Sequence, residues 1–155
     1  MKGYELKIRL DDCRHEVSRT ATVPETLSFS ALAKDLRIMF DLSFLNPSLF
    51  RFPGINTPLW DENDHIPIRD FLDLFKKFTW QYYSKNLTFT VKVKRIKNAD
   101  EHTVVKSFRG EYNPLDYRSA YEFDGMLYEI EASERGLEDI TRFDIEKTNQ
   151  KLKGE

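Results

Sequence analysis

The sequence of 155 residues has only one cysteine, Cys13, and no long apolar run. A single cysteine excludes an internal disulfide and a zinc site built from several cysteines, and it is typical of a reducing compartment. No window approaches the roughly 20 apolar residues of a transmembrane helix. The opening residues alternate with polar side chains, unlike a signal peptide. We therefore expect a cytoplasmic protein that does not contact a membrane.

The common catalytic and cofactor motifs are also lacking. The sequence has no glycine-rich phosphate loop, no paired-histidine metal helix and no nucleophile-elbow pattern. This lowers the expectation of an enzyme, although distant residues can assemble an active site, and no cofactor is expected. The net charge of -2 gives no general attraction for nucleic acid, so a basic site would have to be local.

What the sequence does contain is apolar and aromatic material for a core. Hydrophobic residues make up 40% and aromatic residues 14% of the chain, including 12 Phe. Large rings bury much apolar area when a chain folds. The length fits one domain. We expect a single folded domain over residues 1–155.

Alternating polarity predicts a β-hairpin at the start of the chain. Apolar and polar residues alternate over 4–10 and again over 14–23, with a polar turn at Asp11 and Asp12 between them. A helix is predicted over 29–40, because apolar residues recur at spacings of three and four and Ser28 is placed to cap it. This order resembles the start of a β-grasp fold.

The rest of the sequence predicts further strands and helices. The patterns favour short strands near 49–52 and 59–60, a helix over 68–78, strands over 78–83, 87–96 and 104–108, and helices over 120–132 and 143–155, the last capped by Asp144. Strands and helices do not alternate regularly. The predicted class is therefore α+β, with an antiparallel or mixed sheet covered by helices.

Four stretches together resemble a known family. These are YELKIRL with RTATVPETLSFSALAKDLRIMF, then LTFTVKVKRI, GEYNPLDYRS and FDIEKTNQKL. Their order over the whole chain resembles the plasmid Ri open-reading-frame-three-like family, whose members occur on plasmids and as passengers of transposons. The resemblance implies a fold and a mobile-element history, and no agreed biochemical activity.

Two departures from the family's pattern stand out. The family's acidic turn before a tryptophan is replaced by the neutral to basic stretch 82–87. In the late loop Gly110, Glu111, Pro114 and Asp116 match, but Arg118 and Ser119 replace a glycine pair. The resemblance therefore does not imply that this chain has any function that the family's acidic turn performs.

The stretch 107–123 is the first candidate binding site. It contains side chains that are enriched at protein interfaces. The candidate residues are Arg109, Gly110, Tyr112, Pro114, Asp116, Tyr117, Arg118 and Tyr121. The alternative is a self-contained turn, in which Gly110 permits a tight backbone, Pro114 stiffens the return and Asp116 accepts local hydrogen bonds. The structural interpretation is favoured, because a buried loop must satisfy its own backbone groups.

The basic segment KVKRIK is the second candidate site. Cations along one strand could follow a phosphate backbone, and rings on the neighbouring strand could stack on bases. The candidates are Trp80, Tyr82, Tyr83, Lys92, Lys94, Arg95 and Lys97. The alternative is a solvated strand face whose lysines protect an edge, and it is favoured because acidic residues outnumber basic ones.

Two smaller groups of residues give weaker evidence for a functional site. Asp61, Glu62, Asp64 and His65 lie close in sequence, but their spacing matches no calcium loop, so no metal site is assigned. Cys13 and His15 would share a strand face, yet no third orienting group is evident, and a small buried thiol beside a surface imidazole is favoured.

Three functions follow from the sequence. The first is a binding or adaptor module that captures a protein through the 107–123 loop. The second is a nucleic-acid-binding accessory protein that uses the basic strand, and the third is an enzyme of unknown reaction.

Overall fold

The computed structural model describes residues 1–60, 65–83, 86–115, 118–133 and 140–154. Seven strands form one open sheet in the order β4-β3-β5-β6-β1-β2-β7, and each neighbouring pair is antiparallel. The strands are β1 (Lys2–Leu10), β2 (Ser18–Pro24), β3 (Ser48–Arg51), β4 (Leu59–Trp60), β5 (Lys77–Tyr82), β6 (Leu87–Asn98) and β7 (Val104–Arg109).

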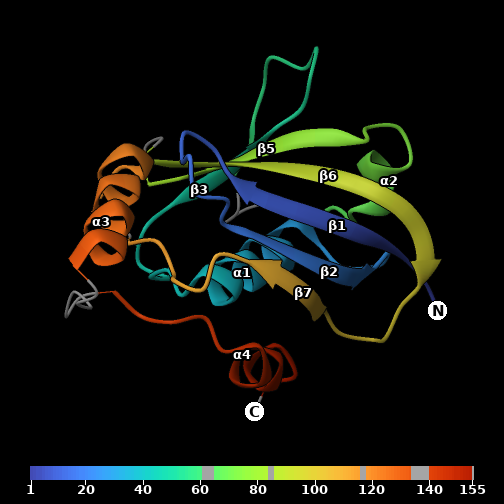
Figure 1. Ribbon diagram of the computed structural model, residues 1–155. Helices are drawn as coiled ribbons and strands as arrows, with labels where there is room; N and C mark the ends of the chain where they lie inside the picture. The colour runs from blue at the N-terminus through green and yellow to red at the C-terminus, as the bar shows by residue number, and fades with distance from the viewer. Residues whose placement is uncertain (61–64, 84–85, 116–117, 134–139, 155) are drawn as a thin grey trace.

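Within the described residues, four helices accompany this sheet (Figure 1). They are α1 (Phe29–Phe40), α2 (Arg69–Leu72), α3 (Ala120–Ser133) and α4 (Ile145–Leu152). Helix α1 packs on one face, and α4 lies beside α1 and β7. Helix α3 stands at the end of the sheet where β1 turns into β2, and α2 lies toward the opposite end. The expected α+β domain, with a hairpin followed by a helix, is confirmed.

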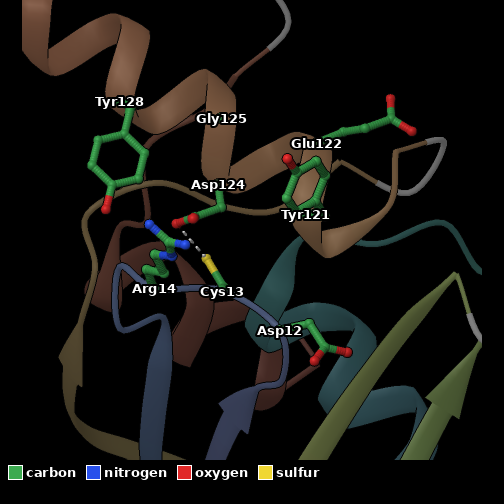
Figure 2. A pocket seen from close by; sticks show the side chains of 8 residues that line it. All are labelled: Asp12, Cys13, Arg14, Tyr121, Glu122, Asp124, Gly125 and Tyr128. Carbon is green, nitrogen blue, oxygen red and sulfur yellow. Dashed lines mark hydrogen bonds between the residues drawn. The ribbon is translucent and has the colours of Figure 1, made fainter.

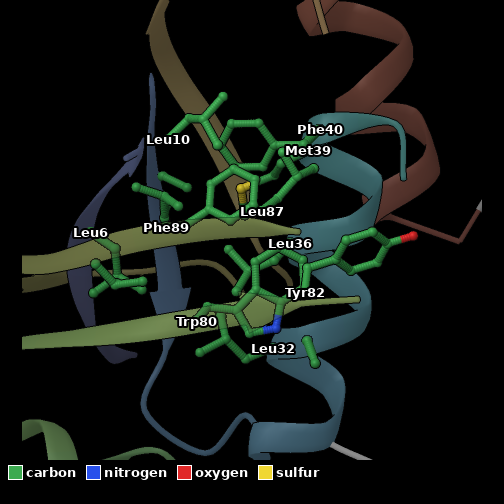
Figure 3. Close-up of a cluster of buried hydrophobic side chains, with 14 of the residues drawn as sticks. Leu6, Leu10, Leu32, Leu36, Met39, Phe40, Trp80, Tyr82, Leu87 and Phe89 are labelled. Atoms are coloured by element: carbon green, nitrogen blue, oxygen red, sulfur yellow. The ribbon is translucent and has the colours of Figure 1, made fainter. Parts of the chain in front are cut away.

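The two faces of the sheet differ because side chains alternate along each strand. We call the face that packs on α1 the inner face. It carries Leu6 of β1, Trp80 of β5 and Phe89 of β6, which pack against α1 side chains such as Leu36 and Phe40 (Figure 3). These side chains are fully buried. Removing them from water is the main apolar stabilisation of the fold.

The opposite, outer face is polar. In β5 and β6 the buried positions alternate with half-buried or exposed ones. Thr79, Gln81, Thr88 and Thr90 therefore lie on the outer face at half-buried positions. An antiparallel sheet can be solvated on one side in this way.

The predicted helix caps are confirmed. The Ser28 hydroxyl accepts a hydrogen bond from the Ala31 N–H at 3.0 Å, and the Asp144 carboxylate accepts one from the Lys147 N–H at 3.1 Å. Each bond satisfies an N–H group that the first helical turn leaves unpaired.

The second predicted helix is wrong in length. Helix α2 ends at Leu72 instead of continuing to residue 78. Lys77 and Phe78 cannot extend it because they pair with Lys92 and Val91 of β6. Strand pairing overrides the helical pattern there. Strand β2 likewise begins at Ser18, later than residue 14. Within the described residues, no helix is long and apolar enough to cross a membrane.

Candidate nucleic-acid interface

Three lysines lie side by side on the outer face. Lys77 of β5 is the register partner of Lys92 of β6, and Lys92 is also the register partner of Lys7 of β1. Side chains at such positions are about 4.5–5.5 Å apart at Cβ. The row therefore places three like charges on three adjacent strands.

A second row of cations runs parallel to the lysine row, two residues away along the strands. It crosses from β3 to β7 through Arg51, Thr79, Thr90, Arg9, Ser18 and Arg109. Three of these six positions are arginines, and the others are hydroxyl residues. We call the six cations of the two rows the basic face: Lys7, Arg9, Arg51, Lys77, Lys92 and Arg109.

One carboxylate, Glu16, partly neutralises the basic face. Its oxygens lie 3.6 Å from Lys7 Nζ, 3.4 Å from an Arg9 nitrogen and 3.7 Å from Arg109 Nε. Burial alone would raise the pKa of Glu16, but a hydrogen bond from Ser18 and the three cations lower it below its usual value. Glu16 is therefore ionised and shared among three partners.

Lys77 and Lys92 have no such compensation. Both side chains are exposed, and no acidic side chain among the described residues forms an ion pair with either. Like charges directly opposite one another in a sheet are destabilising, by roughly 0.2–1 kcal/mol for a pair. The fold itself gains nothing from this arrangement.

The predicted basic segment contributes only part of this surface. Lys92, Lys94, Arg95 and Lys97 are all exposed. However, Arg95 donates two hydrogen bonds to Glu5, at 3.0 and 3.3 Å, and Lys97 lies 3.7 Å from the same carboxylate. Glu5 thus partly neutralises the end of β6, and Lys92 is the predicted cation that joins the row.

The predicted stacking rings require a correction. Trp80 and Tyr82 are fully buried on the inner face, where Trp80 Nε1 donates to Ser48 Oγ at 2.8 Å. They cannot stack on bases because alternation along β5 turns them toward the core. Tyr83 follows the strand with a positive φ of 54° and is 42% exposed, so it is the one predicted ring open to solvent.

Most residues of the basic face were not predicted from the sequence. Lys7, Arg9, Arg51 and Lys77 come from three other strands, and none of them lies in the basic segment KVKRIK. The signal that was present is alternation, which correctly placed Lys7 and Arg9 opposite the apolar side of β1. Their alignment with Lys92 depends on the register between β1 and β6, which no local pattern specifies.

The 107–123 loop is held by a buried arginine. Arg19 of β2 is fully buried, and its guanidinium donates to the backbone carbonyls of Arg109 and Gly110 at 3.2 and 3.4 Å and to the Asn113 side chain at 3.1 Å. Two further bonds reach the carbonyls of Met39 and Ser18.

Three rings surround the same guanidinium. The Arg19 Cζ atom lies 3.9 Å from the ring centre of Phe143, 5.0 Å from that of Phe40 and 5.8 Å from that of Phe108. Burial lowers the pKa of Arg19 to about 9. Arg19 therefore joins the loop to α1 and to the segment before α4, and we call this group the Arg19 cluster.

The loop backbone agrees with the structural interpretation. Gly110 has a φ of 82°, and a Cβ atom at this position would lie 2.5 Å from the Glu16 carbonyl oxygen. Pro114 is buried, and Asn113 donates to Thr141 Oγ1 at 3.1 Å. Asp116 and Tyr117 lie outside the described residues.

The remaining loop candidates reach the surface. Arg109 is exposed and belongs to the basic face. Tyr112 packs under the Arg142 guanidinium at 5.5 Å, and Arg118 forms an ion pair with Glu122 at 3.1 Å. Tyr121 is 81% exposed at the start of α3. The loop thus combines a buried support around Asn113 and Pro114 with exposed side chains such as Arg109 and Tyr121.

Cys13 and His15 meet a third group that sequence reasoning missed. Asp124 of α3 accepts hydrogen bonds from Cys13 Sγ at 3.3 Å and from the His15 N–H at 3.0 Å, and its carboxylate lies 2.8 Å from His15 Nδ1. The other ring nitrogen lies 3.1 Å from Glu131. These contacts fasten the β1–β2 turn to α3, in the region shown in Figure 2.

The protonation states argue against a reactive thiol. Burial, together with the hydrogen bond to Asp124, raises the pKa of Cys13 to about 12. Burial alone would raise the pKa of Asp124, but the bonds from His15 and Cys13 outweigh it and hold the pKa at about 2. The hydrogen bond to Asp124 raises the pKa of His15. A neutral thiol beside an ionised carboxylate is a poor nucleophile.

A surface pocket of about 650 Å³ lies beside this contact (Figure 2). Arg14 and the exposed rings of Tyr121 and Tyr128 line it. Among the described residues no cluster of three or more His, Cys, Asp or Glu side chains could hold a metal. Asp61, Glu62 and Asp64 lie outside those residues.

Comparison with known proteins establishes the fold. No family model matches the chain, and no curated protein matches it. One similar solved structure is the crystal structure of a protein of unknown function, MM3350, from Methanosarcina mazei Go1. It superposes with a TM-score of 0.72 over 94% of this chain and 95% of that chain, at 16% identity. This likeness supports the α+β architecture and assigns no activity.

Proposed function

We propose that the protein binds nucleic acid through the basic face. The observation that carries this proposal is the lysine row, in which Lys77, Lys92 and Lys7 are register neighbours on three adjacent strands. Phosphate groups would neutralise the row, which the protein's own carboxylates leave largely uncompensated.

The charge distribution supports the same conclusion. The protein carries a net charge of -2, yet the basic face gathers six cations, and Glu16 forms ion pairs with only three of them. A second carboxylate nearby, Asp11, accepts a hydrogen bond from Thr90 of the arginine row at 2.7 Å. Because clustered charge produces a local field that net charge does not reveal, a polyanion would be attracted to this face in particular. Arrangements that cost stability are expected where a protein has a function to perform.

The resemblance to plasmid and transposon proteins fits this proposal. We propose that the chain belongs to the plasmid Ri open-reading-frame-three-like family and acts in the cytoplasm as an accessory protein of a mobile element. Nucleic acid is the material on which such an element depends.

The test is fluorescence anisotropy with labelled DNA and RNA over a salt series. The variant Lys77→Gln/Lys92→Gln removes two charges from the lysine row. The control Lys34→Gln/Lys147→Gln removes two exposed charges from α1 and α4. We expect only the first variant to lose affinity, with a salt slope shallower by about one unit for each lysine removed.

Absence of binding at low salt would refute the proposal. So would equal losses in both variants, because a general charge effect does not depend on the face that is changed. Circular dichroism of each variant first establishes that it is folded.

A second candidate function is an adaptor that captures a protein. It rests on Tyr121, which is 81% exposed beside the pocket of Figure 2. Exposed tyrosines are common binding anchors because they join apolar area with a hydroxyl. Affinity capture with wild type and Tyr121→Ala tests it: a partner retained only by wild type supports it, and identical captured sets refute it.

A further inference from the structure

We infer that the ligand of the basic face is a double-helical nucleic acid held by its phosphate backbones, without reading of base sequence. This inference rests on the proposed function and specifies its ligand.

The chemistry of the basic face suits phosphate groups. Between and beside its cations lie the hydroxyls of Thr20, Thr79 and Ser107, which share the two register rows. Ammonium, guanidinium and hydroxyl groups are the side-chain donors that proteins commonly direct at phosphate oxygens. These positions offer no long apolar side chain that could enter between bases.

Base stacking is almost absent from the outer face. Proteins that bind single strands on a sheet place rings on its surface, and each stacked base contributes about 1–3 kcal/mol. Here Phe78, Trp80, Tyr82 and Phe89 of the central strands are all buried. Among the outward positions of the described strands, Trp60 on the edge strand β4 is the only exposed ring, at 50%.

The dimensions of the two rows favour a duplex. Neighbouring strands are about 4.8 Å apart, so the arginine row spans roughly 24 Å from β3 to β7. Two residues along a strand separate the rows by about 6.8 Å. A duplex carries one phosphate charge for about each 1.7 Å of its axis, twice the density of either strand alone. Two parallel rows of cations can therefore contact both backbones of a duplex at once, and the duplex offers them twice the phosphate density of a single strand.

The experiment compares four labelled probes of equal length by fluorescence anisotropy at one salt concentration. They are two DNA duplexes of unrelated sequence, one RNA duplex and one single-stranded DNA that cannot self-pair. We expect both DNA duplexes to bind equally, and the better duplex type to bind about tenfold or more tighter than the single strand. The two duplex types separate DNA from RNA as the source of the backbone.

Trp60→Ala sharpens the test, since it removes the exposed ring and leaves the basic face intact. We expect its duplex affinity to remain within about twofold of wild type. Single-strand binding as tight as duplex binding, a strong sequence preference, or loss of affinity in Trp60→Ala would overturn the inference. Each of these outcomes still leaves nucleic-acid binding intact, whereas no binding to any probe refutes the proposed function itself.

Discussion

The Arg19 cluster and the basic face handle positive charge in opposite ways. Arg19 is fully buried, and carbonyl or amide oxygens and three rings surround it. Lys77 and Lys92 are exposed next to each other without an acidic partner among the described residues. A buried cation that satisfies many acceptors is part of the fold. A solvated row of like charges is not needed for folding, and the proposed function assigns this row to binding.

The largest effect is expected at Arg19. Arg19→Met would leave several buried carbonyl groups without donors, and each unsatisfied group costs about 1–3 kcal/mol. We expect a loss of about 3–5 kcal/mol in the free energy of unfolding, measured by urea denaturation. Arg9→Met is the matched control on the neighbouring strand, because Arg9 is solvated on the outer face, and it should change stability by less than about 0.5 kcal/mol. Equal losses of unfolding free energy in the two variants would contradict the contrast between a structural buried arginine and a solvated one.

Next in size is the backbone at the edge of the Arg19 cluster. Gly110→Ala combines a positive φ with a Cβ atom placed 2.5 Å from the Glu16 carbonyl oxygen, and we expect a loss of about 2–4 kcal/mol. Gly54→Ala is the control, since Gly54 has a φ of 78° but nothing within 4 Å of the added atom. It should cost about 1–2 kcal/mol in thermal unfolding. A smaller loss at Gly110 than at Gly54 would show that the loop is not tightly held.

Lys92→Glu should move binding and stability in opposite directions. The carboxylate would face Lys77 and Lys7, so like-charge repulsion becomes attraction, and we expect a gain of a few tenths of a kcal/mol to about 1 kcal/mol by urea denaturation. Affinity for the preferred duplex should fall by about tenfold or more at low salt. A destabilised variant, or one with the affinity of wild type, would contradict the proposal that the lysine row serves binding and not stability.

The smallest effect is a pH dependence at the contact between the β1–β2 turn and α3. Because Asp124 raises the pKa of His15 in the folded protein, the stabilisation from this pair is complete below the unfolded pKa of about 6.5. It is lost as the pH rises through the higher folded-state pKa. The stability difference between wild type and His15→Gln should therefore be larger at mildly acidic than at mildly alkaline pH, as measured by thermal unfolding. A difference that grows with rising pH would contradict the pairing.

Much of the fold follows from local patterns. Alternation in β1 and β6 correctly separated inner from outer side chains, and Ser28 and Asp144 correctly marked helix starts. The extent of α2 was wrong, because Lys77 and Phe78 satisfy their backbone groups by pairing with β6. A helical pattern in such a short segment is weaker than a sheet partner supplied from elsewhere in the chain.

The candidate sites were harder to predict for the same reason. The tight backbone expected at Gly110 is confirmed by its positive φ, since the freedom to adopt it is a property of glycine itself. The orienting role of Asp124 could not be seen, because it lies 109 residues from His15 in the chain. Alternation along β5 implied that Trp80 and Tyr82 are buried. The predicted stacking on bases would have required these rings to lie on the outer face.

By itself the sequence determined which side chains share a strand face, where helices begin, and that a core rich in rings would form. These properties depend on residues a few positions apart, whose relation is set by strand and helix periodicity. Only the tertiary structure decided that Arg19 is buried among three rings and that Lys7, Lys77 and Lys92 form one row. Both depend on the register between distant strands, which is set by the packing of the whole sheet on α1.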